Sequence, residues 1–69
     1  MTNVGKLKEK ISNSGLKKVY IAQKLGLTYQ GYLQKENGRN EFNAPEISIM
    51  KDLLTLSLKD VDEIFLQSE

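Results

Sequence analysis

The sequence predicts an all-α fold of five short helices. Apolar residues recur at intervals of three and four along the chain, which is the spacing of a single helix face. Glycine, serine, asparagine or proline separates these segments, as expected where helices end and begin. The sequence contains no alternating strand pattern, repeat or low-complexity stretch. With 69 residues, the chain is predicted to form one domain over residues 1–69.

The first helix is expected over residues 4–13. Its apolar positions share one stripe, made of Val4, Leu7 and Ile11. Ser14 and Gly15 interrupt the pattern, and Gly15 can adopt the left-handed conformation that follows a helix end. The chain then turns toward a second helix.

The second helix is expected over residues 18–25 and is joined to the third by a tight turn. Ala22 gives it a face small enough for another helix to cross closely. Its inward positions are Ile21, Ala22 and Leu25. Gly26 ends this helix by taking a positive φ, after which Leu27 points inward. Thr28 is expected to cap the third helix by accepting a backbone N–H.

The third helix is expected over residues 29–36, with Tyr32 or Leu33 in the core. Gly31 lies inside it, at a cost of about 1 kcal/mol in helix preference relative to alanine. Two explanations stay open: the backbone approaches another molecule or a neighbouring segment closely at Gly31, or the glycine has no role.

The fourth helix follows a polar loop over residues 38–43, in which Phe42 is expected to anchor on the core. The helix is expected to begin at Pro45, whose missing N–H costs nothing at the first helical position, and to end near Leu56. Its inward positions are Ile47, Met50, Leu53 and Leu54.

The fifth helix is expected over residues 58–66, with Ser57 as its cap and Asp60 as an acidic residue in its first turn. Its apolar residues are Leu58, Val61, Ile64, Phe65 and Leu66. This is more apolar surface than so small a helix buries easily. Most of it is expected in the core, and the remainder is predicted to form a homodimer or partner interface.

The net charge of +1 hides a division between the two halves of the chain. Residues 1–40 hold eight Lys or Arg and two Glu, a formal charge of +6, whereas residues 41–69 hold two Lys and seven Asp or Glu, a formal charge of −5. Such a division can turn one face toward a polyanion while the other face repels it. The alternative is that the charges only solubilise their own helices.

The composition also excludes several classes of function. The chain has no cysteine and no histidine, so a disulfide, a thiolate metal site and an imidazole base are all excluded. We therefore expect no enzymatic activity, no metal and no cofactor. No apolar run approaches the length of a bilayer-crossing helix, and nothing resembles a signal peptide. A cytoplasmic location without a membrane partner is expected.

Residues 18–38 combine small residues and glycines in an order that places two short helices across a three-residue turn. The order is Ala22, Gly26, Leu27, Thr28 and then Glu36-Asn37-Gly38. It resembles the phage repressor and Cro family of helix-turn-helix proteins. The resemblance covers most of the chain, because the family's small domain also has helices before and after the motif. The sequence departs from the family pattern at Lys17, where a Ser or Thr cap is common, and at Tyr32 and Lys35, where apolar residues are usual.

The resemblance implies a lambda-repressor-like domain that binds double-stranded operator DNA and regulates transcription, in a phage or prophage setting. Its second motif helix would lie in the major groove. The base contacts it implies are Tyr29, Gln30 and Gln34, of which Gln30 can pair bidentately with adenine. The phosphate contacts it implies are Lys18, Thr28, Asn37, Arg39 and Asn40. The first-helix residues Lys6, Lys8 and Lys10 either reach flanking phosphates or form a solvated face.

A rival interpretation belongs to another class of protein. The chain could be an antirepressor or modulator that keeps this fold but binds a second regulator protein through its surface. Tyr29 and Tyr32 favour that interpretation, because tyrosine is enriched at protein interfaces. The short chain suits a Cro-type or modulator protein, or a truncated DNA-binding domain.

Overall fold

The predicted apolar stripes fold as helices at the expected places in the computed structural model, which describes residues 1–66. In chain order the elements are α1 (Val4–Ser14), α2 (Lys18–Lys24), α3 (Tyr29–Glu36), α4 (Ala44–Leu54) and α5 (Leu58–Val61), with α5 continuing into a π-helical turn (Asp62–Leu66). These described residues form five helices and no strand, which confirms the all-α prediction.

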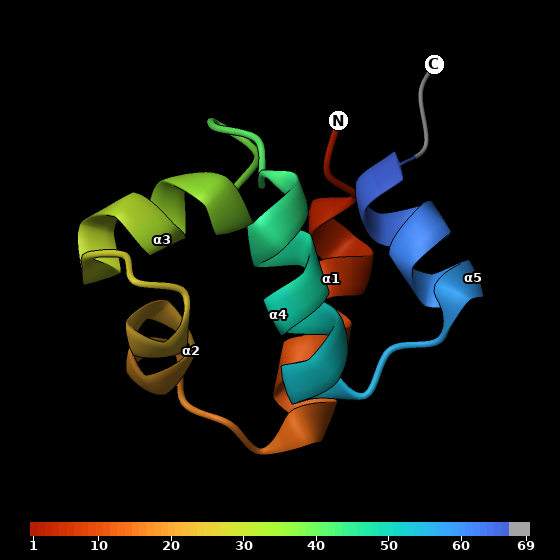
Figure 1. The fold of residues 1–69 in the computed structure, drawn as a ribbon, viewed down its shortest axis with the longest axis horizontal. Coiled ribbons are helices and arrows are strands. Elements are labelled where there is room, and N and C mark those ends of the chain that lie inside the picture. The colour runs from red at the N-terminus through yellow and green to blue at the C-terminus, as the bar shows by residue number, and fades with distance from the viewer. Residues whose placement is uncertain (67–69) are drawn as a thin grey trace.

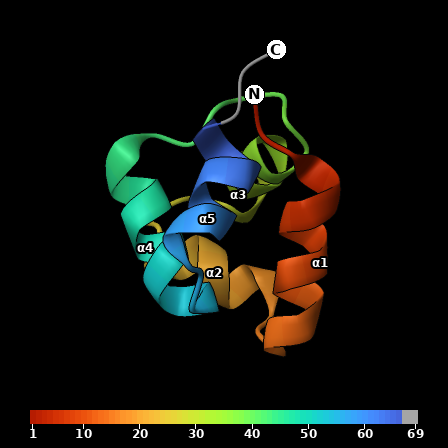
Figure 2. The same ribbon diagram turned by 90° about the vertical axis from the view of Figure 1, so that its right-hand side faces the viewer.

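The helices lie in three positions along the long axis of the molecule (Figure 1). The pair α2 and α3 lies on one side, α1 and α4 lie in the middle, and α5 lies at the opposite edge. In the view turned by 90°, α5 rests across the space between α1 and α4 (Figure 2). The helix α1 contacts α3, α4 and the π-helical turn, so the first helix is in contact with the last element described.

Side-chain caps explain where four of the helices begin. Thr28 accepts a hydrogen bond from the Gly31 amide (3.0 Å), as predicted, and Ser57 accepts one from the Asp60 amide (3.0 Å). Asn3 and Asn43 cap α1 and α4 in the same way. Such caps satisfy amides that have no partner inside the helix.

The fourth helix begins one residue before the predicted start and ends two residues before the predicted end. Asn43 caps it, so the helix begins at Ala44 and Pro45 takes the second position. It ends at Leu54, because Thr55 turns left-handed with φ 53° and the Leu56 amide bonds back to the Lys51 carbonyl (2.9 Å). The turn places Leu56 in the core instead of extending the helix.

The core takes side chains from every helix. The fully or nearly buried apolar residues are Leu7, Ile11, Ile21, Ala22, Leu25, Tyr32, Phe42, Met50, Leu54, Leu56, Val61, Ile64 and Phe65. Phe42 packs edge-on against Tyr32 (ring centroids 6.4 Å apart) and Phe65 (5.3 Å), so the predicted loop anchor is confirmed. Within α3 it is Tyr32 that is buried, whereas Leu33 is only partly covered. The other predicted core residues that are only partly covered are Leu27, Ile47 and Leu53.

Among the apolar residues of the fifth helix, Leu58 is 78% exposed. It lies in the first turn of α5, before the helix reaches the core. Val61, Ile64 and Phe65 are buried, so these three residues belong to the core of the single chain and are not available as an interface. Of the five residues predicted for a homodimer or partner interface, only Leu58 and Leu66 are exposed. Leu66 is 60% exposed.

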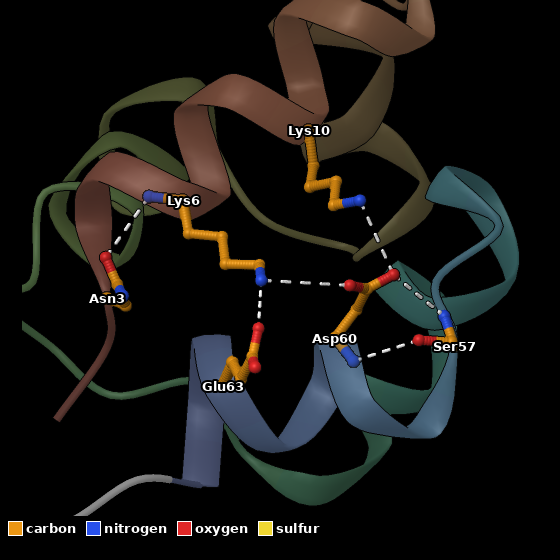
Figure 3. Close-up of polar contacts among 6 residues, drawn as sticks. All are labelled: Asn3, Lys6, Lys10, Ser57, Asp60 and Glu63. Atoms are coloured by element: carbon orange, nitrogen blue, oxygen red, sulfur yellow. Dashed lines mark hydrogen bonds and ion pairs between the residues drawn. The ribbon is translucent and has the colours of Figure 1, made fainter.

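An ion-pair cluster fastens α1 to α5 (Figure 3). The Lys6 ammonium bonds the Glu63 carboxylate and lies 3.9 Å from the Asp60 carboxylate, while the Lys10 ammonium lies 3.5 Å from Asp60. A backbone bond from the Asn3 amide to the Ile64 carbonyl (2.7 Å) joins the same two regions. Two of the three first-helix lysines, which were expected either to reach flanking phosphates or to form a solvated face, thus have carboxylate partners.

Replacing Ala22 by leucine is expected to lower the free energy of unfolding by about 1 to 3 kcal/mol, the usual cost of overpacking. Ala22 is 2% exposed on α2, which packs against α3 and α4, so a larger side chain has no space. Urea denaturation followed by circular dichroism measures the effect. Gln23→Leu, at the exposed neighbouring position, is the control and should change stability little. An unchanged midpoint for Ala22→Leu would contradict the close helix crossing.

Acid is expected to weaken the attachment of α5. The Ser57 amide, with help from Lys10, lowers the pKa of Asp60 below its ordinary 3.8, and Lys6 lowers the pKa of Glu63 below 4.5. Their stabilisation is therefore full above these ordinary values and is lost as the pH falls through the lower folded-state values. Urea unfolding across pH 2–6 should show a smaller loss on acidification in Glu63→Gln than in the wild type. Asp62→Asn, at an exposed carboxylate of the same turn, should keep the wild-type dependence.

Candidate functional site

The burial of Tyr32 determines which side of α3 faces outward. Tyr32 is fully buried, and residues two positions before and after it lie on the opposite side of a helix with 3.6 residues per turn. Those residues are Gln30 and Gln34, which are both exposed. Two of the predicted base contacts therefore share the outward face of α3.

A polar hollow of about 470 Å³ lies on this outward face and is lined by Gln30, Leu33, Gln34, Asn37 and Arg39. The first four of these residues follow the spacing i, i+3, i+4, i+7, which is one face of a helix. Arg39 joins them because its amide bonds the Gln34 carbonyl (2.9 Å). The structure thus brings two predicted base contacts and two predicted phosphate contacts to one surface, which we call the α3 hollow.

Local hydrogen bonds hold the loop after α3 against the helix. The Asn37 side-chain amide donates to the Leu33 carbonyl (2.9 Å), and the Asn40 side-chain amide donates to Gln34 Oε1 at 3.5 Å. The bond from Asn40 is long and exposed, so it leaves Gln34 free to exchange partners. Asn40 is therefore placed beside the α3 hollow although it does not line it.

The absence of a side chain at Gly31 is explained by a close contact within α3 and its cap. A Cβ atom at this position would lie 3.1 Å from the Thr28 hydroxyl oxygen, the same atom that accepts the Gly31 amide hydrogen bond. The close approach is therefore to the cap of the helix itself. Thr28 uses its oxygen as an acceptor in the cap, and its exposed hydroxyl hydrogen remains available to another acceptor.

Lys18 is directed toward a buried carboxylate that the sequence analysis did not identify. Glu36 is fully buried, and the Lys18 ammonium lies 3.3 Å from its Oε2 atom without hydrogen-bond geometry. Neither oxygen of Glu36 accepts a hydrogen bond within residues 1–66, and the buried hydroxyl of Tyr32 makes none there either. Burial, together with the negative charge of Glu36, raises the pKa of Tyr32 above its ordinary value. The four-residue spacing of Tyr32 and Glu36 is the signal that could have placed both on the inward face.

Lys35 also has a structural partner. Its ammonium lies 2.6 Å from Glu46 Oε1, which also accepts the Asn43 amide (3.0 Å) at the start of α4. Glu46 is 7% exposed, so this pair joins α3 to α4 near the core. The lysine found where the resembled family has an apolar residue therefore contributes an ion pair instead of apolar packing.

A second concave region of about 640 Å³ lies between α1, α2 and the start of α3, and we call it the α1–α2 groove. Tyr29, 44% exposed, lines this groove and not the α3 hollow. The predicted base contacts thus divide between two neighbouring surfaces, and Lys18 lies with Tyr29. Lys8, the remaining candidate of α1, also lines the groove.

Comparisons of this chain with protein-family models, with curated proteins and with solved structures find no match. What its surfaces bind is therefore inferred from their residues. Across residues 1–66, no helix combines the length and the apolar character needed to cross a bilayer.

Removal of the Lys18 ammonium is expected to destabilise the fold by about 1 to 3 kcal/mol, because it leaves the buried Glu36 carboxylate without its nearest cation. The value lies below that of a fully buried pair, since the Lys18 side chain is 42% exposed. Urea unfolding of Lys18→Ala measures the effect, and adding Glu36→Gln should restore part of the loss. Lys17→Ala, at an exposed neighbour, is the control. Equal stability of Lys18→Ala and wild type would show that the pair does not hold Glu36.

Proposed function

We propose that this protein is a sequence-specific DNA-binding regulator of transcription, of the phage repressor and Cro type, and that α3 enters the major groove of operator DNA. The α3 hollow is the observation that carries this proposal. It combines two exposed glutamines on one helix face with an asparagine and an arginine directly after the helix. Glutamine side chains can read base edges, and arginine and asparagine side chains can bind phosphates. The residues suited to base contacts therefore lie directly beside the residues suited to phosphate contacts.

The relation of α2 to α3 supports a helix-turn-helix arrangement. The two helices contact each other, and the connection between them contains Gly26 with φ 73° and the Thr28 cap. The Leu27 amide bonds the Ala22 carbonyl (3.0 Å), which closes the end of α2 before the chain turns into α3. In such a unit α2 would lie across the DNA backbone while α3 presents Gln30 and Gln34.

The charge distribution narrows the set of phosphate contacts. Four of the eight basic residues in the first 40 positions have carboxylate partners within residues 1–66, namely Lys6, Lys10, Lys18 and Lys35. The basic residues that have none there are Lys8, Lys17, Lys24 and Arg39. These four residues would supply most of the attraction to DNA, and Arg39 adjoins the base-reading glutamines.

A dimer would suit an operator with two half-sites. The residues left for a homodimer interface on the C-terminal helix are Leu58 and Leu66. Analytical ultracentrifugation with and without operator DNA would separate a dimer in solution from one that forms on DNA.

The exposed Val19, Tyr20 and Tyr29 favour a second candidate function, that of a modulator that binds another regulator protein. Val19 and Tyr29 line the same groove, and apolar surface gathered in one place on a small protein indicates an interaction site. Under this alternative, contact with a protein would replace base readout.

Selection from a pool of random duplex DNA, followed by binding measurements on the best site, tests the proposed function. Gln30→Ala is expected to cost about 1 to 3 kcal/mol on that site, the value of a bidentate base contact, with little loss on random DNA. Arg39→Ala is expected to weaken binding to both and to reduce the slope of log K against log salt by about 0.9. All variants are compared at one salt concentration and across a salt series.

Two matched variants control for surface changes away from the α3 hollow. Gln23→Ala replaces an exposed glutamine of α2, and Lys59→Ala replaces an exposed cation of the acidic half. Both should bind like the wild type. Failure to enrich any sequence, or equal discrimination by Gln30→Ala and wild type, would contradict direct readout by Gln30.

A further inference from the structure

The α1–α2 groove combines an apolar lining with a basic rim. Its apolar side chains are Ile11, Leu16, Val19 and Tyr29. Val19 is 60% exposed, although α2 buries Ile21 and Ala22 on its other side. A volume of about 640 Å³ is in the range of hollows that receive small molecules or inserted side chains. The groove therefore has space for an apolar group that the domain itself does not supply.

Three lysines line the groove, and within the described residues 1–66 only Lys18 among them has a carboxylate partner, the buried Glu36. Lys8 and Lys17 line the groove, and neither has a carboxylate partner within residues 1–66. Among the described residues 1–66, no Asp or Glu lines the groove. Lys6 and Lys10, by contrast, are paired with α5. The helix α1 thus directs Lys6 and Lys10 to carboxylates of the C-terminal helix, while Lys8 lies beside an apolar hollow.

We propose that the α1–α2 groove binds an acidic, amphipathic segment of a partner protein. One large apolar side chain of that segment packs against Leu16, Val19 and Tyr29, and flanking carboxylates pair with Lys8 and Lys17. Charge complementarity requires an anionic occupant, and the concave apolar lining requires an inserted side chain. A peptide supplies both, whereas an anionic bilayer is too flat to fill the groove and a phosphate backbone has no large apolar side chain to insert.

The position of the groove gives its occupant a regulatory effect. Tyr29 and Lys18 line the groove and also belong to the predicted DNA contacts. A bound segment would cover both residues, so it would compete with operator DNA. This consequence rests on the proposed function, whereas binding of the peptide does not.

Selection of peptides tests the proposal. A phage-displayed library of random 12-residue peptides is selected against the folded protein, and the most enriched peptide is synthesised and titrated into ¹⁵N-labelled protein. We expect enriched peptides to carry a net negative charge and at least one large apolar residue. Amide shift changes should concentrate in residues 8–19 and at Tyr29.

Variants of the groove and of the opposite half then separate specific binding from general charge attraction. Lys8→Ala/Lys17→Ala should weaken peptide binding about five- to tenfold, the effect expected from two exposed ion pairs. Val19→Asp should weaken it at least as much, since it places a carboxylate in the apolar lining. Lys51→Ala/Lys59→Ala removes the same charge from the acidic half and should leave the affinity unchanged. Circular dichroism establishes that each variant is folded.

Several results would overturn the proposal. These are enrichment of no peptide, enrichment without acidic bias, shift changes at the α3 hollow or α5 instead of the groove, and equal affinity for Lys8→Ala/Lys17→Ala and wild type. Binding to phosphatidylserine vesicles that depends on Lys8 and Lys17, without any peptide binding, would identify a membrane contact and would also overturn it.

Competition between the peptide and a selected operator duplex tests peptide binding by the groove separately from the proposed DNA-binding function. Displacement of the duplex by the peptide supports mutual exclusion. Peptide binding to a protein that selects no DNA sequence would support the groove and overturn the DNA-reading function. Peptide binding that leaves a bound operator in place would support the groove and overturn the exclusion.

Discussion

The packing of Tyr32 in the core determines which face of α3 is exposed to solvent. Its ring lies in the core against Phe42, which in turn packs on Phe65, so a chain of aromatic contacts links α3 through a loop to the C-terminal helix. A helix with one large side chain fixed inward has little freedom to rotate. The orientation of Gln30 and Gln34 toward solvent is therefore a consequence of core packing. The loop residue Phe42 contributes to that orientation because it packs against Tyr32.

The charges of the chain divide into those used inside the fold and those left on its surface. The pairs that Lys6 and Lys10 make with Asp60 and Glu63 attach the basic N-terminal helix to the acidic C-terminal one. The formal charge of the first 40 residues therefore overstates the attraction that this half exerts on a polyanion. Partly covered ion pairs of this kind contribute modestly to stability, so their main effect is to select which cations remain available.

The sequence was sufficient to predict the helices, most of their ends and the core, because these depend on local rules. The apolar spacing of α1, the Thr28 cap and the turn at Gly26 each involve residues a few positions apart. Which apolar residues of the fifth helix are buried was not predictable, because periodicity gives the face of a helix but not the point at which the helix reaches the core. The end of α4 was missed because a left-handed threonine is unusual and Thr55 carries no glycine-like signal.

The candidate site was predictable only in part, for a related reason. The positions of Gln30 and Gln34 followed from the motif, yet the pairs of Lys18 with Glu36 and of Lys35 with Glu46 join different helices. Contacts across helices depend on how the helices pack, which a single sequence does not state. The position of Tyr29 outside the α3 hollow was not predictable for the same reason, because it depends on where α1 and α2 pack beside the start of α3.

The bond between the Asn3 amide and the Ile64 carbonyl has a consequence for how the domain forms. Together with the Lys6–Glu63 pair, it joins residues from opposite ends of the described chain. Among the described elements α1 comes first in the chain, and the turn that contacts it comes last. The loop closed by these contacts is nearly as long as the domain, so its closure carries a large entropic cost and comes late. We expect a chain that lacks residues 58–66 to leave one side of α1 uncovered.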